Sequence, residues 1–136
     1  MVKLVEASFS VQGDSLSPAA VEDATGFIFG EKDKRTPGEI GTRGRYKGQP
    51  NPYGSVTLFA PGDVPDEDKL LWLVDAVEPH ADTLRQLGAT DGSLYVTYAY
   101  EAQCNLAFDP VLLGRIAGLG FDFWVSCYDD PGAFEE

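Results

Sequence analysis

The sequence predicts an α+β domain in which helices lie mainly on one face of an antiparallel sheet, with a ferredoxin-like β-α-β-β-α-β core followed by a C-terminal helix and strand. Apolar and polar residues alternate in three separate segments, and proline follows a capping residue at two helix starts. A longer apolar stripe with helical spacing lies between them. With 136 residues, of which 43% are hydrophobic, the chain can form one domain over residues 1–136.

The first strand and the first helix are marked by different signals. Between residues 5 and 11, apolar side chains occupy every second position, as expected of a strand with one buried face. Ser17 then precedes Pro18, and a capping hydroxyl followed by proline at the first helical position is typical of a helix start. A helix is therefore predicted from about Pro18 to Gly26.

The middle of the chain predicts two strands and the longest helix. A short strand is predicted over Arg43–Lys47 and a longer one over Val56–Ala60, separated by a turn rich in Pro, Asn and Gly. A helical pattern follows from about Asp66 to Leu87, and its acidic first turn suits the positive end of a helix dipole. Pro79 removes a backbone donor inside this segment, so we expect the helix to bend or divide there.

The last third of the chain repeats the signals of the first. Alternation returns over Leu94–Tyr100 and over Phe121–Cys127, which predicts two further strands. Between these strands Asp109 precedes Pro110, and this second cap predicts a helix from Pro110 to about Gly120.

Charge and composition exclude several classes of function. The formal net charge is −12, and a mostly negative surface repels phosphate, so we do not expect a nucleic-acid partner. No run reaches the roughly 18 apolar residues of a membrane span, so we expect a cytoplasmic protein without a membrane partner. Cys104 and Cys127 lie far apart without metal-ligand spacing, which predicts two reduced thiols, no metal site and no cofactor.

A single histidine limits the enzymatic options. A Ser-His-Asp or Cys-His relay would have to pass through His80, which follows Pro79 with Glu78 and Asp82 nearby. No spacing among the 22 acidic residues selects a carboxylate pair for glycoside chemistry. We therefore predict no catalytic residues and expect a binding protein more than an enzyme.

Charge is unevenly distributed along the chain. Residues 31–47, the basic loop, contain six basic and three acidic side chains, so their local charge is +3 and the remainder carries −15. Glycines keep its backbone permissive, and an aromatic ring lies between two cations. The basic loop is either a solvated loop whose cations pair within the molecule, or an anion or ligand site. The candidate residues of such a site are Arg43, Arg45, Tyr46 and Lys47.

Acidic and aromatic side chains indicate a protein-binding surface. Acids gather at the long helix start and near the C-terminus, where they either attract a basic partner or compensate a helix dipole and solvate the tail. In the last strand Cys127 continues the apolar face and is predicted to lie in the core, while the alternate residues face an open sheet surface or a second layer formed by residues 31–55. The candidate partner-binding residues are Asp66, Glu67, Asp68, Tyr95, Trp124, Tyr128, Asp129 and Asp130, and Glu135 and Glu136 complete the acidic tail.

Several motifs, taken in order, are similar to those of one family. They are Gly13-Asp14-Ser15-Leu16-Ser17-Pro18, Thr42 with Lys47-Gly48, Leu73-Val74-Asp75-Ala76-Val77-Glu78-Pro79, the Leu84 to Leu87 turn, and Ile116-Ala117-Gly118-Leu119-Gly120 before a strand ending at Tyr128. Over nearly the whole chain they resemble the bacterial domain-of-unknown-function family 4279. The resemblance implies a small α+β domain without an established activity. Some small acidic bacterial domains of this kind resemble immunity proteins that neutralise toxins, and the resemblance allows that role.

Three hypotheses about function follow. The leading one is a small acidic protein that binds another protein, in an immunity-type role against a basic partner. The alternative is a small-molecule or anion-binding domain, with or without catalysis, that uses the basic loop. The third is a homo-oligomer that buries its aromatic sheet face between copies.

Overall fold

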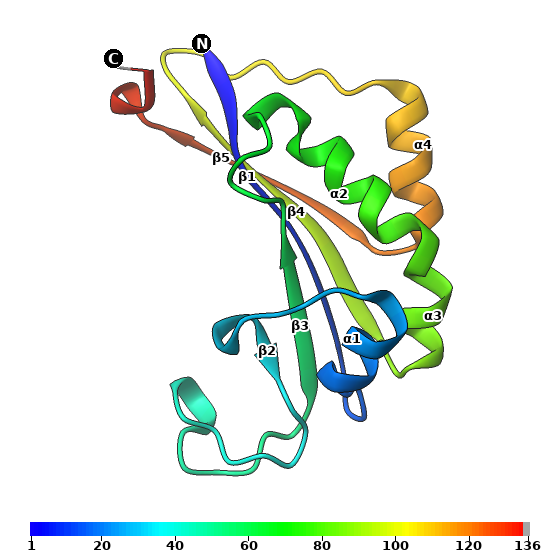
Figure 1. Cartoon of the computed structure of the whole chain (residues 1–136). Coiled ribbons are helices and arrows are strands. Elements are labelled where there is room, and N and C mark those ends of the chain that lie inside the picture. The colour runs from blue at the N-terminus through cyan, green and yellow to red at the C-terminus, as the bar shows by residue number, and fades with distance from the viewer. Residues whose placement is uncertain (135–136) are drawn as a thin grey trace. The chain divides into compact units, whose positions relative to one another are not determined.

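A computed structural model describes residues 1–134, which form an α+β fold with one mixed sheet (Figure 1). The α+β class predicted from the sequence is therefore confirmed. The strands are β1 (Val2–Gly13), β2 (Lys34–Arg35), β3 (Gly54–Phe59), β4 (Asp91–Tyr100) and β5 (Asp122–Asp129). The helices are α1 (Pro18–Thr25), α2 (Lys69–Val77), α3 (Ala81–Gln86) and α4 (Pro110–Leu119).

The sheet of the described residues has the strand order β2-β3-β1-β4-β5. β2 runs antiparallel to β3, with Lys34 opposite Val56, whereas β5 runs parallel to β4, with Leu94 opposite Phe123. The prediction of a purely antiparallel sheet is therefore wrong at the last strand. The reason is the connection from β4 to β5, because a crossover that contains a helix returns the chain in its original direction.

The chain divides into two compact units by its packing. Unit 1 contains Met1–Phe9, Phe59–Glu78 and the residues from Ser93 onward, and unit 2 contains Ser10–Leu58 and Pro79–Gly92. Strands β1, β3 and β4 contribute residues to both units.

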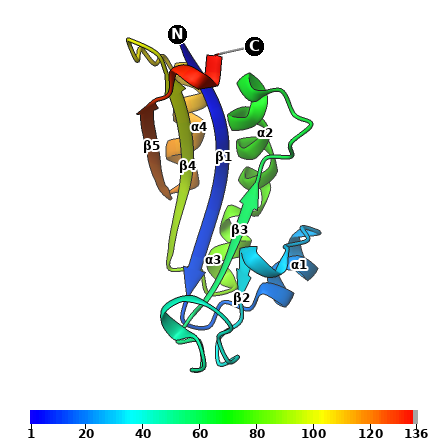
Figure 2. The same cartoon turned by 90° about the vertical axis from the view of Figure 1, so that its left-hand side faces the viewer.

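In unit 1, helices α2 and α4 lie on the same side of the strands (Figures 1 and 2). Arg115 of α4 links the two helical segments, since its Nη2 donates to Asp75 Oδ1 at 2.6 Å and its Nε donates to Glu78 Oε2 at 3.1 Å. The apolar core of this unit consists of Leu4, Ala7, Phe9, Leu70, Leu73, Val74, Val77, Leu94, Val96, Ala99, Ile116 and Leu119.

In unit 2, helix α1 has the predicted start and end. Ser17 Oγ accepts a hydrogen bond from Ala20 N at 3.3 Å, and Gly26 ends the helix with a φ of 80°, a left-handed conformation that glycine adopts without strain. The apolar core of this unit consists of Val11, Leu16, Val21, Phe29, Val56, Ala81, Leu84 and Ala89.

The predicted long helix divides at Pro79, as expected. A 3-10 turn over Asp66–Asp68 leads into α2, and a second 3-10 turn over Glu78–His80 separates α2 from α3. Within residues 1–134, the helices all fall short of the length and hydropathy that a membrane span requires.

The strand predicted over Arg43–Lys47 is wrong. Gly44–Tyr46 forms a 3-10 turn, and Gly44 and Gly48 have φ values of 72° and 78°, which no extended strand accommodates. The short strand forms instead at Lys34–Arg35, where pairing with β3 supplies its hydrogen bonds.

Candidate functional site

Strands β4 and β5 carry an exposed group of aromatic side chains, Tyr95, Trp124 and Tyr128, here called the aromatic face. The parallel register places Tyr95 opposite Trp124 and Ala99 opposite Tyr128. Tyr95 is 38% exposed, Trp124 57% and Tyr128 42%. Because Leu94 is buried, alternation along β4 turns Tyr95 away from the side that α2 and α4 cover. Within unit 1 these three exposed side chains fit an open sheet surface, one of the two alternatives that the sequence left for this face.

The aromatic face extends to the edge of the sheet. β5 is last in the strand order, so its outer edge has no strand partner within residues 1–134, and such an edge can pair with another chain. Asp122 and Asp129 begin and end this strand. Asp130 follows, and its backbone N–H donates to Tyr100 O at 2.9 Å. Carboxylates therefore flank the aromatic face at both ends, while Glu135 and Glu136 lie outside the described residues.

The acidic residues at positions 66–68 lie on the other side of unit 1. They form the turn that leads into α2, which covers the opposite side of the sheet. Asp66 Oδ1 accepts a hydrogen bond from Lys69 Nζ at 2.7 Å, so one of the three carboxylates already has a cationic partner. The predicted partner-binding residues are thus divided: Asp129 and Asp130 accompany the aromatic face, and Asp66, Glu67 and Asp68 do not.

Cys127 is exposed, so its predicted place in the core is wrong. A side chain on an edge strand has a neighbouring strand on one flank only, and Val125 on the same strand is likewise 39% exposed. Partial burial and a hydrogen bond with Cys104 raise the pKa of the Cys127 thiol. Because the thiolate is the reactive form, this shift makes Cys127 a weaker nucleophile at neutral pH.

His80, in unit 2, is half-buried and packs edge-on against Phe27 at 5.3 Å between ring centroids. The contact gives this imidazole a packing role next to the break between α2 and α3. Groups of three His, Cys, Asp or Glu side chains that could hold a metal ion do not occur among residues 1–134.

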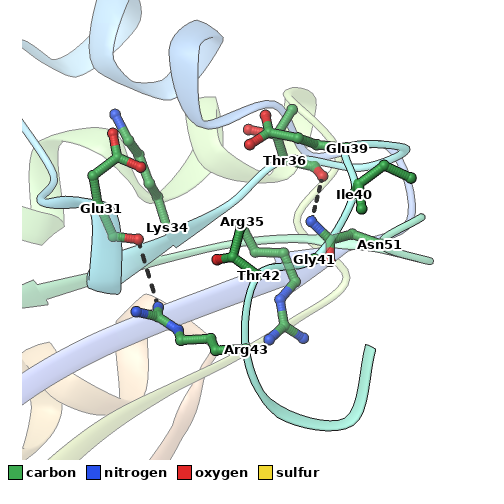
Figure 3. Close-up of a pocket in the computed structure, with 10 residues that line it drawn as sticks. All are labelled: Glu31, Lys34, Arg35, Thr36, Glu39, Ile40, Gly41, Thr42, Arg43 and Asn51. Atoms are coloured by element: carbon green, nitrogen blue, oxygen red, sulfur yellow. Dashed lines mark hydrogen bonds between the residues drawn. The ribbon is translucent and has the colours of Figure 1, made fainter. Parts of the chain in front are cut away.

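The basic loop of unit 2 folds around a pocket of about 290 Å³ (Figure 3). Gly38 N donates to Asn51 O at 2.8 Å, and Asn51 N donates to Glu39 O at 2.8 Å, which holds the two sides of the loop together. The buried Asn51 amide also donates to Thr36 O at 3.0 Å. The lining residues are Glu31, Lys34, Arg35, Thr36, Glu39, Ile40, Gly41, Thr42, Arg43 and Asn51.

Two cations of this pocket are engaged within the molecule. Arg43 Nη2 donates to Lys32 O at 2.6 Å and to Glu31 O at 3.5 Å, and Figure 3 shows the second of these bonds. Lys34 Nζ lies 3.8 Å from Glu22 Oε1. Arg43 therefore holds two backbone carbonyls of the loop, and Lys34 pairs with a carboxylate of α1.

Arg35 is engaged by two tyrosine rings. Its Nη1 donates to the Tyr53 hydroxyl at 2.7 Å, and its guanidinium carbon lies 5.1 Å from the Tyr53 ring and 5.6 Å from the Tyr46 ring. Arg45 also lies 5.6 Å from the Tyr46 ring. Cation–π contacts of this kind stabilise the loop.

Of the four predicted anion-binding residues, Arg43 alone lines the pocket. Arg45 and Tyr46 contact each other, and the Lys47 backbone N–H donates to Gly44 O at 3.2 Å. The sequence analysis did not select Lys34, Arg35 or Asn51 as site residues. Asn51 could not be selected from local pattern, because only the fold brings it next to Thr36. Since Lys34, Arg35, Arg43 and Arg45 already have partners, the geometry favours a structural role for the basic loop.

Comparisons of the chain with family models, with curated proteins and with solved structures found no match. The resemblance to the domain-of-unknown-function family therefore stays a prediction from the sequence motifs. On its geometry, the aromatic face of β4 and β5 is the candidate functional site.

Proposed function

We propose that the protein acts by binding a basic protein through the aromatic face. The register pair Tyr95 and Trp124 is the observation that carries this proposal, because two large rings lie opposite each other on neighbouring strands and remain exposed. Tyrosine and tryptophan supply large contact areas at a low cost in conformational entropy, and they are enriched at protein interfaces.

Charge supports a basic partner. Asp122, Asp129 and Asp130 flank the aromatic face, and the whole chain has a net charge of −12. A field of this sign attracts a positively charged protein and speeds its association, while the aromatic contacts slow its release. An immunity-type inhibitor that covers a basic toxin fits this chemistry, and we propose that role for the protein.

Replacement of Trp124 tests the proposal. A protein captured by the wild type from the source cell is purified, and its Kd is measured by calorimetry against wild type and Trp124→Ser. We expect Trp124→Ser to weaken binding by about 30-fold, since truncation of a central aromatic residue at an interface costs about 2 kcal/mol or more. Binding should also weaken when NaCl is raised from about 0.05 M to about 0.5 M, because salt screens the flanking carboxylates.

Val111 provides the matched control. It is 72% exposed on α4, outside the aromatic face, so Val111→Ser should leave the Kd unchanged. Equal weakening by Trp124→Ser and Val111→Ser would contradict the proposal. A wild-type protein that elutes as a dimer, and that Trp124→Ser converts to a monomer, would assign the aromatic face to a second copy of the chain instead.

We also propose that β1 to β4 form a variant of the ferredoxin-like fold. β1 and β2 are joined through α1 and separated in the sheet by β3, and β3 and β4 are joined through α2 and α3 and separated by β1. Two such interleaved split β-α-β units support this interpretation. α4 and β5 then add an ordinary parallel β-α-β unit at the edge. An experimental structure with a different strand order would contradict it.

A further inference from the structure

A second pocket, of about 450 Å³, lies in unit 1 and is separate from the aromatic face. Its walls come from the start of β1, from Tyr98 on β4, from residues 107–109 and from the first turns of α2 and α4. Leu4, Leu70 and Leu112 make most of its lining apolar. Its size and apolar walls are those of sites that hold small organic ligands.

An aromatic wall closes one side of this pocket. The Tyr98 and Phe108 rings meet edge-to-face at 6.4 Å, and Phe108 contacts Phe123 in the same way at 5.6 Å. Burial, followed by the nearby Cys127 and Cys104, raises the pKa of the Tyr98 hydroxyl. A tyrosine hydroxyl is neutral at physiological pH and can donate or accept a hydrogen bond.

Carboxylates outnumber cations around the pocket. Asp66, Glu67 and Asp109 line it together with Lys3. Lys69 adds a second cation, because its Nζ lies 2.7 Å from Asp66 Oδ1 and compensates that carboxylate. The Lys3 ammonium lies 5.6 Å from the ring centroid of Phe134, which is not a lining residue. Glu67 is exposed at the rim. An apolar pocket with this charge attracts a cation and repels an anion of the same shape.

We infer that this pocket binds an organic ammonium ion whose apolar body packs against Leu70 and Phe108 and whose charged group lies beside the Glu67 carboxylate. The inference uses no residue of the aromatic face, so it stands or fails independently of the proposed protein partner.

Three probes of related shape test the inference. Phenethylammonium, phenylacetate and ethylammonium are titrated into the full chain at about 0.15 M NaCl, an ionic strength that screens unspecific attraction to the acidic surface. Binding is followed by calorimetry and by ¹H–¹⁵N spectra. We expect saturable binding of phenethylammonium, with shifts at residues 67–71 and 107–112, and binding at least about tenfold weaker for phenylacetate and for ethylammonium.

Two variants locate the site. Ala107→Leu adds volume at an exposed lining residue and should abolish phenethylammonium binding, and Glu67→Gln should weaken it by about two- to fivefold, as expected for one exposed ion pair. Asp63→Asn removes an exposed carboxylate outside the lining and should leave the Kd unchanged. Equal binding of the three probes, or equal effects of Glu67→Gln and Asp63→Asn, would overturn the inference.

Discussion

At the scale of single residues, two aspartates at helix starts differ in what their side chains do. Asp109 Oδ1 accepts a hydrogen bond from Val111 N at 2.7 Å and another from Leu112 N at 3.4 Å, so it satisfies donors that the first turn of α4 leaves unpaired. Asp68 has the equivalent position before α2, yet its side chain makes no capping bond, because a 3-10 turn already precedes that helix. We therefore expect Asp109 to contribute more to the stability of the protein than Asp68 does.

Replacement of each aspartate by alanine measures this difference. Asp109→Ala should lower the free energy of unfolding by about 1 kcal/mol, the usual cost of losing an N-cap. Asp68→Ala removes the same charge without a capping bond and should change it by less than about 0.5 kcal/mol. Urea unfolding followed by circular dichroism gives both values. Equal losses would mean that charge, and not capping, controls the stability of these helix starts.

At the scale of elements, one glycine fixes how closely β3 approaches the turn after β1. A Cβ atom added to Gly54 would lie 1.7 Å from Leu16 O and 2.9 Å from Pro37 Cδ, so any larger residue forces the backbone apart. We expect Gly54→Ala to destabilise the protein by at least about 2 kcal/mol, as overpacking of a tight contact does.

Gly62 is the matched control for Gly54, since a Cβ added there meets nothing within 4 Å. Gly62→Ala should keep the unfolding midpoint of the wild type. The two variants are compared by urea unfolding. If Gly54→Ala fails to fold while Gly62→Ala folds, that result also supports the close approach of β3 to Leu16. A Gly54→Ala protein as stable as Gly62→Ala would show that β3 does not approach Leu16 this closely.

The elements that could be predicted from the sequence are those whose signals come from neighbouring residues. The Ser17 cap, the Asp109 cap and the break at Pro79 each depend on neighbouring residues, and each appears in the structure where expected. β2 depends on pairing with β3, about twenty residues away, so its two residues carry no signal of their own. The position of Arg43–Lys47 ahead of a turn rich in Pro, Asn and Gly favoured a strand there, but the left-handed glycine at position 44 prevents one.

The candidate site was predictable only in part, for the same reason. Alternation along β5 was enough to set Trp124 and Tyr128 on one side of the strand, but it did not decide whether that side is open. The pairing of Tyr95 with Trp124 depends on the parallel crossover. Cys127 was misplaced because its exposure depends on β5 being the edge strand. The unit 1 pocket is lined by several segments that are distant in sequence, so no local sequence pattern predicts it.

At the scale of the whole molecule, negative charge opposes the folded state. The chain has 22 acidic and 10 basic side chains, and the ion pairs of the described residues engage Lys34, Lys69, Arg85 and Arg115. These pairs are mostly exposed and contribute little each, whereas repulsion among the remaining carboxylates acts over the whole surface. Salt should therefore stabilise this protein, because it screens repulsion more than it weakens attraction.

Thermal unfolding at increasing NaCl tests this balance. Between about 0.01 M and about 0.3 M NaCl the Debye length falls from about 30 Å to about 6 Å, so long-range repulsion is screened while contacts such as Arg115 with Asp75 persist. The Tm should rise by about 4 °C for each kcal/mol of repulsion removed. Arg115→Gln removes a cation that serves two carboxylates, so its Tm should start lower and rise more with salt. A Tm that falls as NaCl is added would mean that the ion pairs stabilise the protein more than the repulsion destabilises it. The argument that net charge attracts a basic partner would then no longer be supported.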